Sequence, residues 1–383
     1  MPYLDNAATS FPKAPGVPEA VAAFLKDTAG SPGRSAHRHS RNSSRVLFEC
    51  RESLARLLGL SDSRRVLFTS GATEALNLAL RGILRAGDRV LVSGLEHNAV
   101  MRPLRWLSPR LGLHIDVVPP DDEGRLKPSD FHRALRHDTA LVVVNHASNV
   151  CGTVAPIADI RACIGQVPLL VDASQSAGSV DINVERDGVD LLAFTGHKSL
   201  LGPQGTGGLA VVAGLEDAIE PLRLGGTGSR SDTQEQPEML PDRYEGGTPN
   251  TPGIAGLLEA LRYLERRGLN DILAHEEGLA QKLHEGLRDI DGVRVIGPRS
   301  SENTVPTRSF ITSTHTPDEI GFRLERQYDV AVRVGLHCAP LAHQSLGSFP
   351  TGGVRMSLNA LSTDEDLETA LDALRAVTEK SAR

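Results

Sequence analysis

The sequence predicts an α/β fold with a large domain built on a mostly parallel sheet and a smaller α+β domain. From about residue 44, short apolar runs alternate with segments of helical periodicity. Strands that are apolar on both faces and separated by helices indicate a parallel sheet covered by helices. After residues 245–250 the pattern changes to a long helical region followed by strands and helices in mixed order. We therefore predict a large domain over residues 15–250 and a small domain formed by residues 1–14 and 251–383.

The individual elements follow from the spacing of apolar residues. In the large domain we predict helices over residues 44–58 and 73–84. Its predicted strands cover residues 65–69, 89–93, 115–118, 140–145, 169–172, 191–195 and 208–212. In the small domain the predicted helices cover residues 253–288 and 317–327 and a segment from about 363, and the predicted strands cover residues 293–296, 308–311, 330–334 and 354–358. Acidic residues at the start of the last helix suit the positive end of its dipole.

Net charge, apolar runs and cysteine spacing argue against several classes of protein. The net charge of −7 argues against nucleic acid as the main partner. No stretch approaches the roughly 20 apolar residues of a membrane span, and the N-terminus lacks the basic and apolar segments of a signal peptide. The four cysteines show no CxxC or other metal-ligand spacing, so we predict no metal site. Free thiols and the missing signal peptide predict a cytoplasmic protein.

Two predicted strands end in residues that suit one cofactor. Strand 169–172 ends at Asp172, and strand 191–195 is followed by Lys198. Open α/β sheets bind ligands at the carboxyl ends of their strands. A lysine that forms a Schiff base and an aspartate that pairs with a pyridinium nitrogen are what pyridoxal 5'-phosphate (PLP) needs. The alternatives are an ordinary surface lysine and an aspartate that caps a helix, but the apolar runs favour a PLP enzyme.

Other segments at strand ends fit the same cofactor. Residues Ser70–Glu74 lie between a strand and a helix, where backbone N–H groups and the Thr73 hydroxyl would bind a phosphate. The same residues could form a capping box. His97 follows a strand and could stack on the cofactor ring and shuttle protons, or serve only structure. Asn149 could bond the ring oxygen or a substrate carboxylate, and Gln175 could donate to the ring oxygen.

Cys338 lies in a polar loop after strand 330–334. A thiol in such a loop, beside His337 and near arginine, should be more thiolate-like and nucleophilic, although an inert cysteine is the alternative. Arg355 lies on the next predicted strand. It suits a bidentate grip on a substrate carboxylate, with a surface ion pair as the alternative.

In their order along the chain, these motifs resemble the class V aminotransferase-like PLP enzymes, and within them the cysteine desulfurases. The resemblance covers nearly the whole chain and is carried by Tyr3–Thr9, Ser70–Glu74, Glu96–His97, Ser148–Val150, Asp172–Gln175, Thr195–Lys198, Glu245–Asn250, Arg333–Cys338 and Arg355. It implies the aspartate aminotransferase-like fold, fold type I of the PLP-dependent transferases.

The resemblance also implies roles for single residues. Catalytic roles fall to Lys198, Cys338 and His97. Cofactor binding falls to Ala72, Thr73, His97, Asn149, Asp172, Gln175, Thr195, His197, Lys198 and Thr248. Substrate binding falls to Asn149, Arg333 and Arg355. In the family the threonine at the position of Thr248 reaches the phosphate site of the other subunit, which implies a homodimer with shared active sites.

The activity implied is conversion of L-cysteine to L-alanine, with a persulfide formed on Cys338 and passed to an acceptor protein. A selenocysteine lyase acting on L-selenocysteine is the closest alternative. Others are a class V transaminase, epimerase or β-lyase with an incidental Cys338, and a non-catalytic sulfur carrier. The short loop over residues 338–355 resembles the SufS-like, selenocysteine-lyase-related group, whereas Gly71–Glu74 and Ser35–Arg38 are nearer the IscS-like pattern. We interpret the chain as a divergent branch of the first group.

Overall fold

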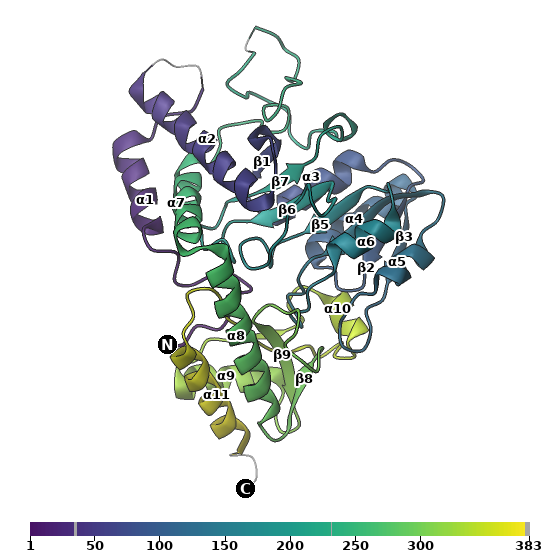
Figure 1. Cartoon of the computed structure of the whole chain (residues 1–383), viewed down its shortest axis with the longest axis vertical. Coiled ribbons are helices and arrows are strands. Elements are labelled where there is room, and N and C mark those ends of the chain that lie inside the picture. The colour runs from purple at the N-terminus through teal and green to yellow at the C-terminus, as the bar shows by residue number, and fades with distance from the viewer. Residues whose placement is uncertain (34–36, 231, 380–383) are drawn as a thin grey trace.

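The computed structural model describes residues 1–33, 37–230 and 232–379 and contains two sheets surrounded by helices (Figure 1). Ser35 and Ala36, which entered the comparison of subgroups, lie outside the described residues. The larger sheet has the order β1-β7-β6-β5-β4-β2-β3. Its strands are β1 (Val66–Thr69), β2 (Arg89–Ser93), β3 (His114–Val118), β4 (Thr139–Asn145), β5 (Leu169–Asp172), β6 (Leu191–Thr195) and β7 (Gly207–Val211).

The larger sheet is mostly parallel. Strands β2 to β6 pair in parallel, whereas β7 runs antiparallel to both β6 and β1. Every residue of β5 and β6 is buried. Along β5, Leu169 and Val171 pack into one hydrophobic core and Leu170 into another, because alternate residues of a strand point to opposite faces. Burial on both faces explains the nearly continuous apolar runs in the sequence.

Helices cover both faces of this sheet. Helices α3 (Ala72–Ile83) and α4 (Asn98–Leu111) pack on the face that contains Leu170. The opposite face is covered by α2 (Arg38–Leu58), α5 (Pro128–Ala134), α6 (Ile157–Ile164) and α7 (Thr251–Arg267), and α7 also packs against α1 (Val17–Ala23). In the described parts of the chain, none of the helices combines the length and the apolar character needed to cross a membrane.

The smaller sheet is antiparallel and has the order β10-β11-β9-β8. Its strands are β8 (Val293–Ile296), β9 (Thr307–Thr312), β10 (Arg333–Gly335) and β11 (Gly353–Ser357), and its core includes residues of α8 (Leu269–Arg288), α9 (Pro317–Tyr328) and α11 (Asp364–Glu379). The N-terminal segment joins the two sheets. Asp5 bridges to Ser357 of the smaller sheet, while the Ser10 amide donates to the carbonyl of His197 (2.8 Å), just beyond the larger one.

The predicted fold class is confirmed, and the bounds of β2, β5, β6 and β8 match the prediction. Most other elements are shifted by one residue at one or both ends, and three differ more. Helix α2 begins six residues earlier than predicted, where the His37 side chain accepts from the Ser40 amide. The helical region 253–288 is two helices, because Gly268 (φ 85°) breaks it. Residues 330–332 are not strand, since Ala331 makes only an isolated bridge to Tyr3.

Five helices in the described residues were not predicted: α1, α4, α5, α6 and α10 (Pro340–Ser345). Four of them are eight residues or shorter, so they offer two turns or less of apolar spacing. Helix α4 is longer, but it contains Pro103 and Pro109, and proline is disfavoured in a helix interior. This helix matters most, because His97 caps its first turn.

A close approach of two backbones requires a glycine at position 207. A Cβ atom there would lie 2.6 Å from the Cα of Gly71 and 2.6 Å from the carbonyl oxygen of Phe194. We expect Gly207→Ala to lower the free energy of unfolding by about 1–3 kcal/mol, because backbone atoms cannot yield as side chains do. The matched control is Gly278→Ala inside α8, where a Cβ meets nothing within 4 Å. It should raise stability by up to about 1 kcal/mol. Urea unfolding measures both, and equal effects would contradict the expectation.

Candidate active site

Most of the predicted cofactor-binding residues gather around a cavity of about 190 Å³. Strands β4, β5 and β6 deliver their last residues, Asn145, Asp172 and Thr195, to its wall, and helix α3 contributes its first turn. The cavity is lined by Ser70, Gly71, Ala72, Thr73, Glu74, His97, Ala99, Asn145, Asn149, Asp172, Ser174, Gln175, Thr195, His197 and Lys198. This is the edge where the carboxyl ends of parallel strands meet and where α/β sheets bind ligands.

Lys198 is half-buried at this edge, three residues beyond β6. Burial lowers the pKa of its ammonium group to about 8, and the cationic Arg355 and Arg333 act in the same direction. Asp172 and Cys338 oppose that change as negative partners. A lysine with a lowered pKa yields its neutral, nucleophilic amine more easily at neutral pH.

Asp172 is buried, and its Oδ1 accepts a hydrogen bond from the Ser174 amide (3.0 Å). The carboxylate thus has local donors and faces the lysine across the cavity. A buried carboxylate at this point favours a cationic partner in whatever binds there.

Two histidines of the cavity are neutral. Burial lowers the pKa of His97 and of His197 to about 4, and the charge of Lys198 acts in the same direction on both. The Nδ1 atom of His97 accepts from the Ala99 amide (3.0 Å), so its proton sits on Nε2. The buried Nδ1 atom of His197 has no hydrogen-bond partner in the described structure.

The first turn of α3 offers unpaired amides beside small residues. Gly71 is its N-cap and provides no side-chain cap, and a Cβ at Gly71 would lie 3.5 Å from the Thr195 hydroxyl. Glu74 accepts from the Ser70 amide (2.7 Å), so this glutamate binds the backbone of the loop just before the helix. Thr73 is exposed at the cavity edge. The free amides and hydroxyl groups suit a phosphate.

The side chains of Asn149 and Gln175 are each oriented by a hydrogen bond of their own. Gln175 donates from Nε2 to the carbonyl of Ala7 (2.8 Å). Asn149 donates from Nδ2 to the carbonyl of His337 (2.7 Å), while its buried Oδ1 has no partner in the described structure. Each amide is therefore oriented, and the oxygen of Asn149 is left to accept from a ligand.

Cys338 is exposed and lines a second cavity, of about 470 Å³, which shares Thr73, His97 and Ala99 with the first. Its carbonyl accepts from the amide of Asn98 (2.8 Å), at the start of α4. The thiol loop of the small sheet is thus fastened to the large domain next to the predicted cofactor residues. This contact between distant segments could not be read from the sequence.

His337 does not supply the positive charge that the sequence suggested for the neighbouring thiol. Its side chain is buried, and burial together with Arg355 lowers the pKa of the imidazole to about 2. At neutral pH it is uncharged. The cationic neighbours of the thiol loop are instead Arg333 and Arg355, which face each other across β10 and β11.

Arg355 is buried and already paired. It forms an ion pair with Asp5 (2.6 Å) and donates to the carbonyl of Asn149 (3.1 Å), while its Nε has no partner in the described structure. The alternative of a surface ion pair is wrong, because only 1% of this residue is exposed. Asp5 lies within the Tyr3–Thr9 motif, but nothing in the sequence indicated this pairing.

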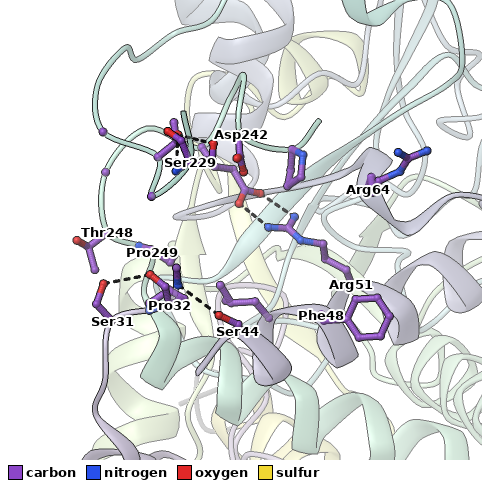
Figure 2. A pocket seen from close by; sticks show the side chains of 18 of the residues that line it. Ser31, Pro32, Ser44, Phe48, Arg51, Arg64, Ser229, Asp242, Thr248 and Pro249 are labelled. Atoms are coloured by element: carbon purple, nitrogen blue, oxygen red, sulfur yellow. Dashed lines mark hydrogen bonds and ion pairs between the residues drawn. The ribbon is translucent and has the colours of Figure 1, made fainter. Parts of the chain in front are cut away.

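Thr248 lies apart from the other predicted cofactor residues. It is exposed and lines a separate cavity of about 640 Å³ (Figure 2). The segment before it is anchored, because Glu245 forms a bidentate ion pair with Arg51 and accepts from the Phe68 amide. Thr248 therefore contributes nothing to the cavity around Lys198 of its own chain.

The residues of the first cavity fit PLP. The unpartnered polar atoms of Asn149 and His197 are buried and need a ligand, Asp172 is a buried carboxylate, and free amides begin α3. Lys198 carries the amine. Sequence reasoning gave no role to Glu96. This residue is fully buried, accepts from Ser93 (2.6 Å) and from the Asn145 amide (2.6 Å), and leaves Oε2 without a partner in the described structure.

Glu96 should make stability depend on pH. Burial and the nearby Asp172 raise the pKa of its carboxyl from 4.5 to about 8. Between these values the unfolded chain has lost the proton and the folded chain keeps it, so stability falls as pH rises. Glu96→Gln cannot ionise at this position. Raising the pH from 5 to 8 should therefore lower the free energy of unfolding of the parent by about 1–3 kcal/mol more than that of Glu96→Gln. Urea unfolding at both pH values tests this, with exposed Glu277→Gln as control. Equal pH slopes in all three proteins would contradict it.

The chain matches the family model "Aminotransferase class-V" over residues 2–370. It is 34% identical to a probable cysteine desulfurase of Methanothermobacter thermautotrophicus, covering 98% of this chain and 94% of that protein. The apo structure of a cysteine desulfurase from Thermococcus onnurineus NA1 superposes with a TM-score of 0.92 at 31% identity, covering 99% of this chain and 94% of that one. The cysteine desulfurase CsdA of Escherichia coli, an S-sulfonic acid form, gives 0.87 at 26% identity, covering 99% and 95%. The chain therefore belongs to the class V aminotransferase family, and within it to the cysteine desulfurases.

Proposed function

We propose that this chain is a PLP-dependent cysteine desulfurase that converts L-cysteine to L-alanine and keeps the sulfur as a persulfide on Cys338. The observation that carries the proposal is the position of Cys338. It is an exposed thiol in the second cavity, which shares Thr73, His97 and Ala99 with the cavity of Lys198, and its backbone is fastened there through Asn98. A class V transaminase needs the lysine and the aspartate but has no use for a thiol at this place.

Lys198, Asp172 and the first turn of α3 would hold the cofactor. Lys198 would bind it covalently, the Asp172 carboxylate would pair with the ring nitrogen, and the amides around Thr73 would bind its phosphate. His97 would stack on the ring, and Thr195 and His197 would add phosphate contacts, in keeping with the unpartnered Nδ1 of His197. When bound, PLP supplies an electron sink for the bonds at the substrate's α-carbon.

Lys198 and His97 are the groups that can move the substrate's α-proton. The lowered pKa of Lys198, about 8, lets its released amine act as a base near neutral pH. His97 is neutral, carries its proton on Nε2 and is fixed by the Ala99 amide at Nδ1. It can therefore donate a hydrogen bond into the cavity, but it accepts a proton at Nδ1 only if that cap is broken.

Cys338 would perform the sulfur step. Its thiolate attacks the sulfur of the substrate, the sulfur–sulfur bond forms, and the bond between sulfur and the substrate's β-carbon breaks. The electron pair of that bond stays with the carbon, which takes a proton and leaves as part of alanine. The persulfide sulfur then passes to a thiol of an acceptor protein. Because Cys338 is exposed, such an acceptor can reach it.

Arg355 and Arg333 would hold the substrate carboxylate together with Asn149. Arg355 is oriented by Asp5 and by the Asn149 carbonyl, and its Nε is unpartnered. The free Oδ1 of Asn149 can accept from the substrate or from the cofactor's ring. Both arginines act electrostatically on Lys198, and two cations near that amine favour an amino acid over an amine as substrate.

We further propose a cytoplasmic homodimer in which Thr248 completes the phosphate site of the partner subunit. Thr248 is exposed, and its segment is rigidly anchored by Arg51 and Glu245. It lines a different cavity from the start of α3 in its own chain, which supports a role at the phosphate site of another subunit. The four free cysteines support a reducing compartment.

Replacing Cys338 by alanine should stop desulfuration without releasing the cofactor. We expect alanine formation from L-cysteine, measured with a reductant, to fall by at least about 100-fold, because no other described group can take the sulfur. The absorbance of bound PLP should stay unchanged. The matched control is Cys163→Ala, which removes a half-buried thiol on α6 and should behave like the parent. Unchanged alanine formation in Cys338→Ala would contradict the proposal. Selenide release from L-selenocysteine that persists in this variant would favour the lyase alternative.

The role of Thr248 can be tested by mixing one subunit that lacks Thr248 with one that lacks Lys198, at a PLP concentration that leaves the Thr248→Ala dimer mostly without cofactor. We expect Thr248→Ala to weaken PLP binding by about tenfold, the loss of one hydrogen bond to a charged group. In a mixed dimer of Thr248→Ala and Lys198→Ala chains, one site would carry both defects and the other would be intact. Activity should therefore return to about half that of the parent dimer. A mixed dimer no more active than its two parents would show that Thr248 does not act across subunits.

A further inference from the structure

The nucleophile sits in a strained stretch of backbone. His337 and Cys338 have φ angles of 50° and 56°, so two successive residues with side chains occupy the left-handed region. Each such residue is disfavoured and persists only where its surroundings fix it. The backbone is fixed from the large domain, where Asn149 donates to the His337 carbonyl (2.7 Å) and Asn98 to the Cys338 carbonyl (2.8 Å). The opposite side of the stretch is held by a side-chain contact.

That contact is a chain of hydrogen bonds behind the thiol. His343, on α10, places Nε2 at 3.2 Å from Nδ1 of His337 and Nδ1 at 2.7 Å from the hydroxyl of Ser348. The Nε2 atom of His337 lies 3.5 Å from the carbonyl of Arg333 on β10. All three side chains are buried, and His343 is 0% exposed.

The direction of this chain follows from its ends. A carbonyl can only accept, so Nε2 of His337 carries a proton and its Nδ1 is a bare acceptor. Nε2 of His343 must then donate to it, which leaves Nδ1 of His343 to accept from the Ser348 hydroxyl. Each nitrogen and the hydroxyl has one partner and one role. A proton added at Nδ1 of His337 would face the N–H of His343.

The surroundings keep both imidazoles uncharged. Burial, with the cationic Arg355 acting in the same direction, lowers the pKa of His337 to about 2 and that of His343 to about 4. The hydrogen-bond roles are therefore the same throughout the neutral pH range. His337 is tied to the scaffold rather than to the thiol, and the tie runs through His343.

We propose that His343 is a positioning residue for Cys338. Together with Ser348 it fixes the tautomer of His337, and it thereby holds the strained His337–Cys338 backbone with the thiol in the second cavity, next to that of Lys198. The use of the thiol rests on the proposed function, whereas the hydrogen-bond chain and the backbone conformation do not.

Two variants at position 343 separate positioning from packing. His343→Leu removes the donor, and His343→Gln retains an amide N–H at about the reach of Nε2. We expect kcat for alanine formation to fall by about tenfold in His343→Leu, with KM and PLP absorbance unchanged, and by less than about threefold in His343→Gln. His284→Leu, at a buried histidine of α8 that contacts the Arg299 carbonyl (2.9 Å), is the matched control. It should lower Tm and leave kcat alone. Parent-like kcat in His343→Leu would overturn the proposal.

Ser348→Ala adds a coupling test that does not depend on the leucine variant alone. It should lower kcat by about threefold in the parent, through loss of one hydrogen bond, and cause no further loss in His343→Leu. If His343→Leu fails to fold, the same cycle is run with His343→Gln, whose loss should likewise not add to that of Ser348→Ala. If the two substitutions lower kcat by independent factors that multiply, the proposed coupling through the hydrogen bonds is wrong.

A readout without turnover distinguishes this proposal from the proposed function. Hydrogen exchange of the peptide that contains Cys338 should be faster in His343→Leu than in the parent and should return to the parent rate in His343→Gln. His284→Leu should not change it. If the parent makes no alanine, the proposed function fails while the exchange still decides the positioning role. Equal exchange in all variants would overturn the positioning role whatever the activity.

Discussion

The site depends on one buried guanidinium that joins three distant parts of the chain. Arg355 on β11 pairs with Asp5 of the N-terminal segment and donates to the carbonyl of Asn149, beyond β4 of the large sheet. A buried arginine without a carboxylate would be costly, so the pairing with Asp5 makes the N-terminal segment part of the site. The same segment passes from Ser357 to His197, next to Lys198. The small sheet, the N-terminus and the large sheet thus meet where the thiol and the lysine must meet.

Burial around this junction sets the charges of the site. It lowers the pKa of Lys198 to about 8 and keeps His97, His197, His337 and His343 neutral, because cationic forms lose their hydration there. Positive charge is therefore concentrated on the arginines and the lysine. An anionic substrate meets these cations, while the imidazoles remain available as neutral donors and acceptors. Glu96 follows the same rule with opposite sign, since burial raises its pKa to about 8.

The sequence could predict those features that depend on neighbours in the chain. Asp172 and Lys198 follow apolar strands, and residues at the ends of adjacent parallel strands must meet whatever the loops do. The pairing of Arg355 with Asp5 spans 350 positions, and no local pattern marks it. In the sequence His343 is one residue of an unpredicted helix within the polar loop, and nothing local marks its contact with His337. Helix α4 was not predicted, and it contains two prolines, which are disfavoured in a helix interior. Most of the cofactor-binding residues chosen from motifs line one cavity, but the motifs did not reveal which polar atoms were already bonded within the protein.

This last distinction bears on how a thiol can both attack sulfur and hand it on. A persulfide must form inside the site but be offered to an acceptor outside it, so its carrier belongs on the rim and not in the wall. In this chain the wall is rigid strand and helix, whereas Cys338 is an exposed residue whose backbone lies in a disfavoured conformation. Such strain is held only by contacts from both domains, through Asn149 and Asn98 on one side and His343 on the other. The position of this carrier therefore depends on contacts from two directions and not on its own backbone preference.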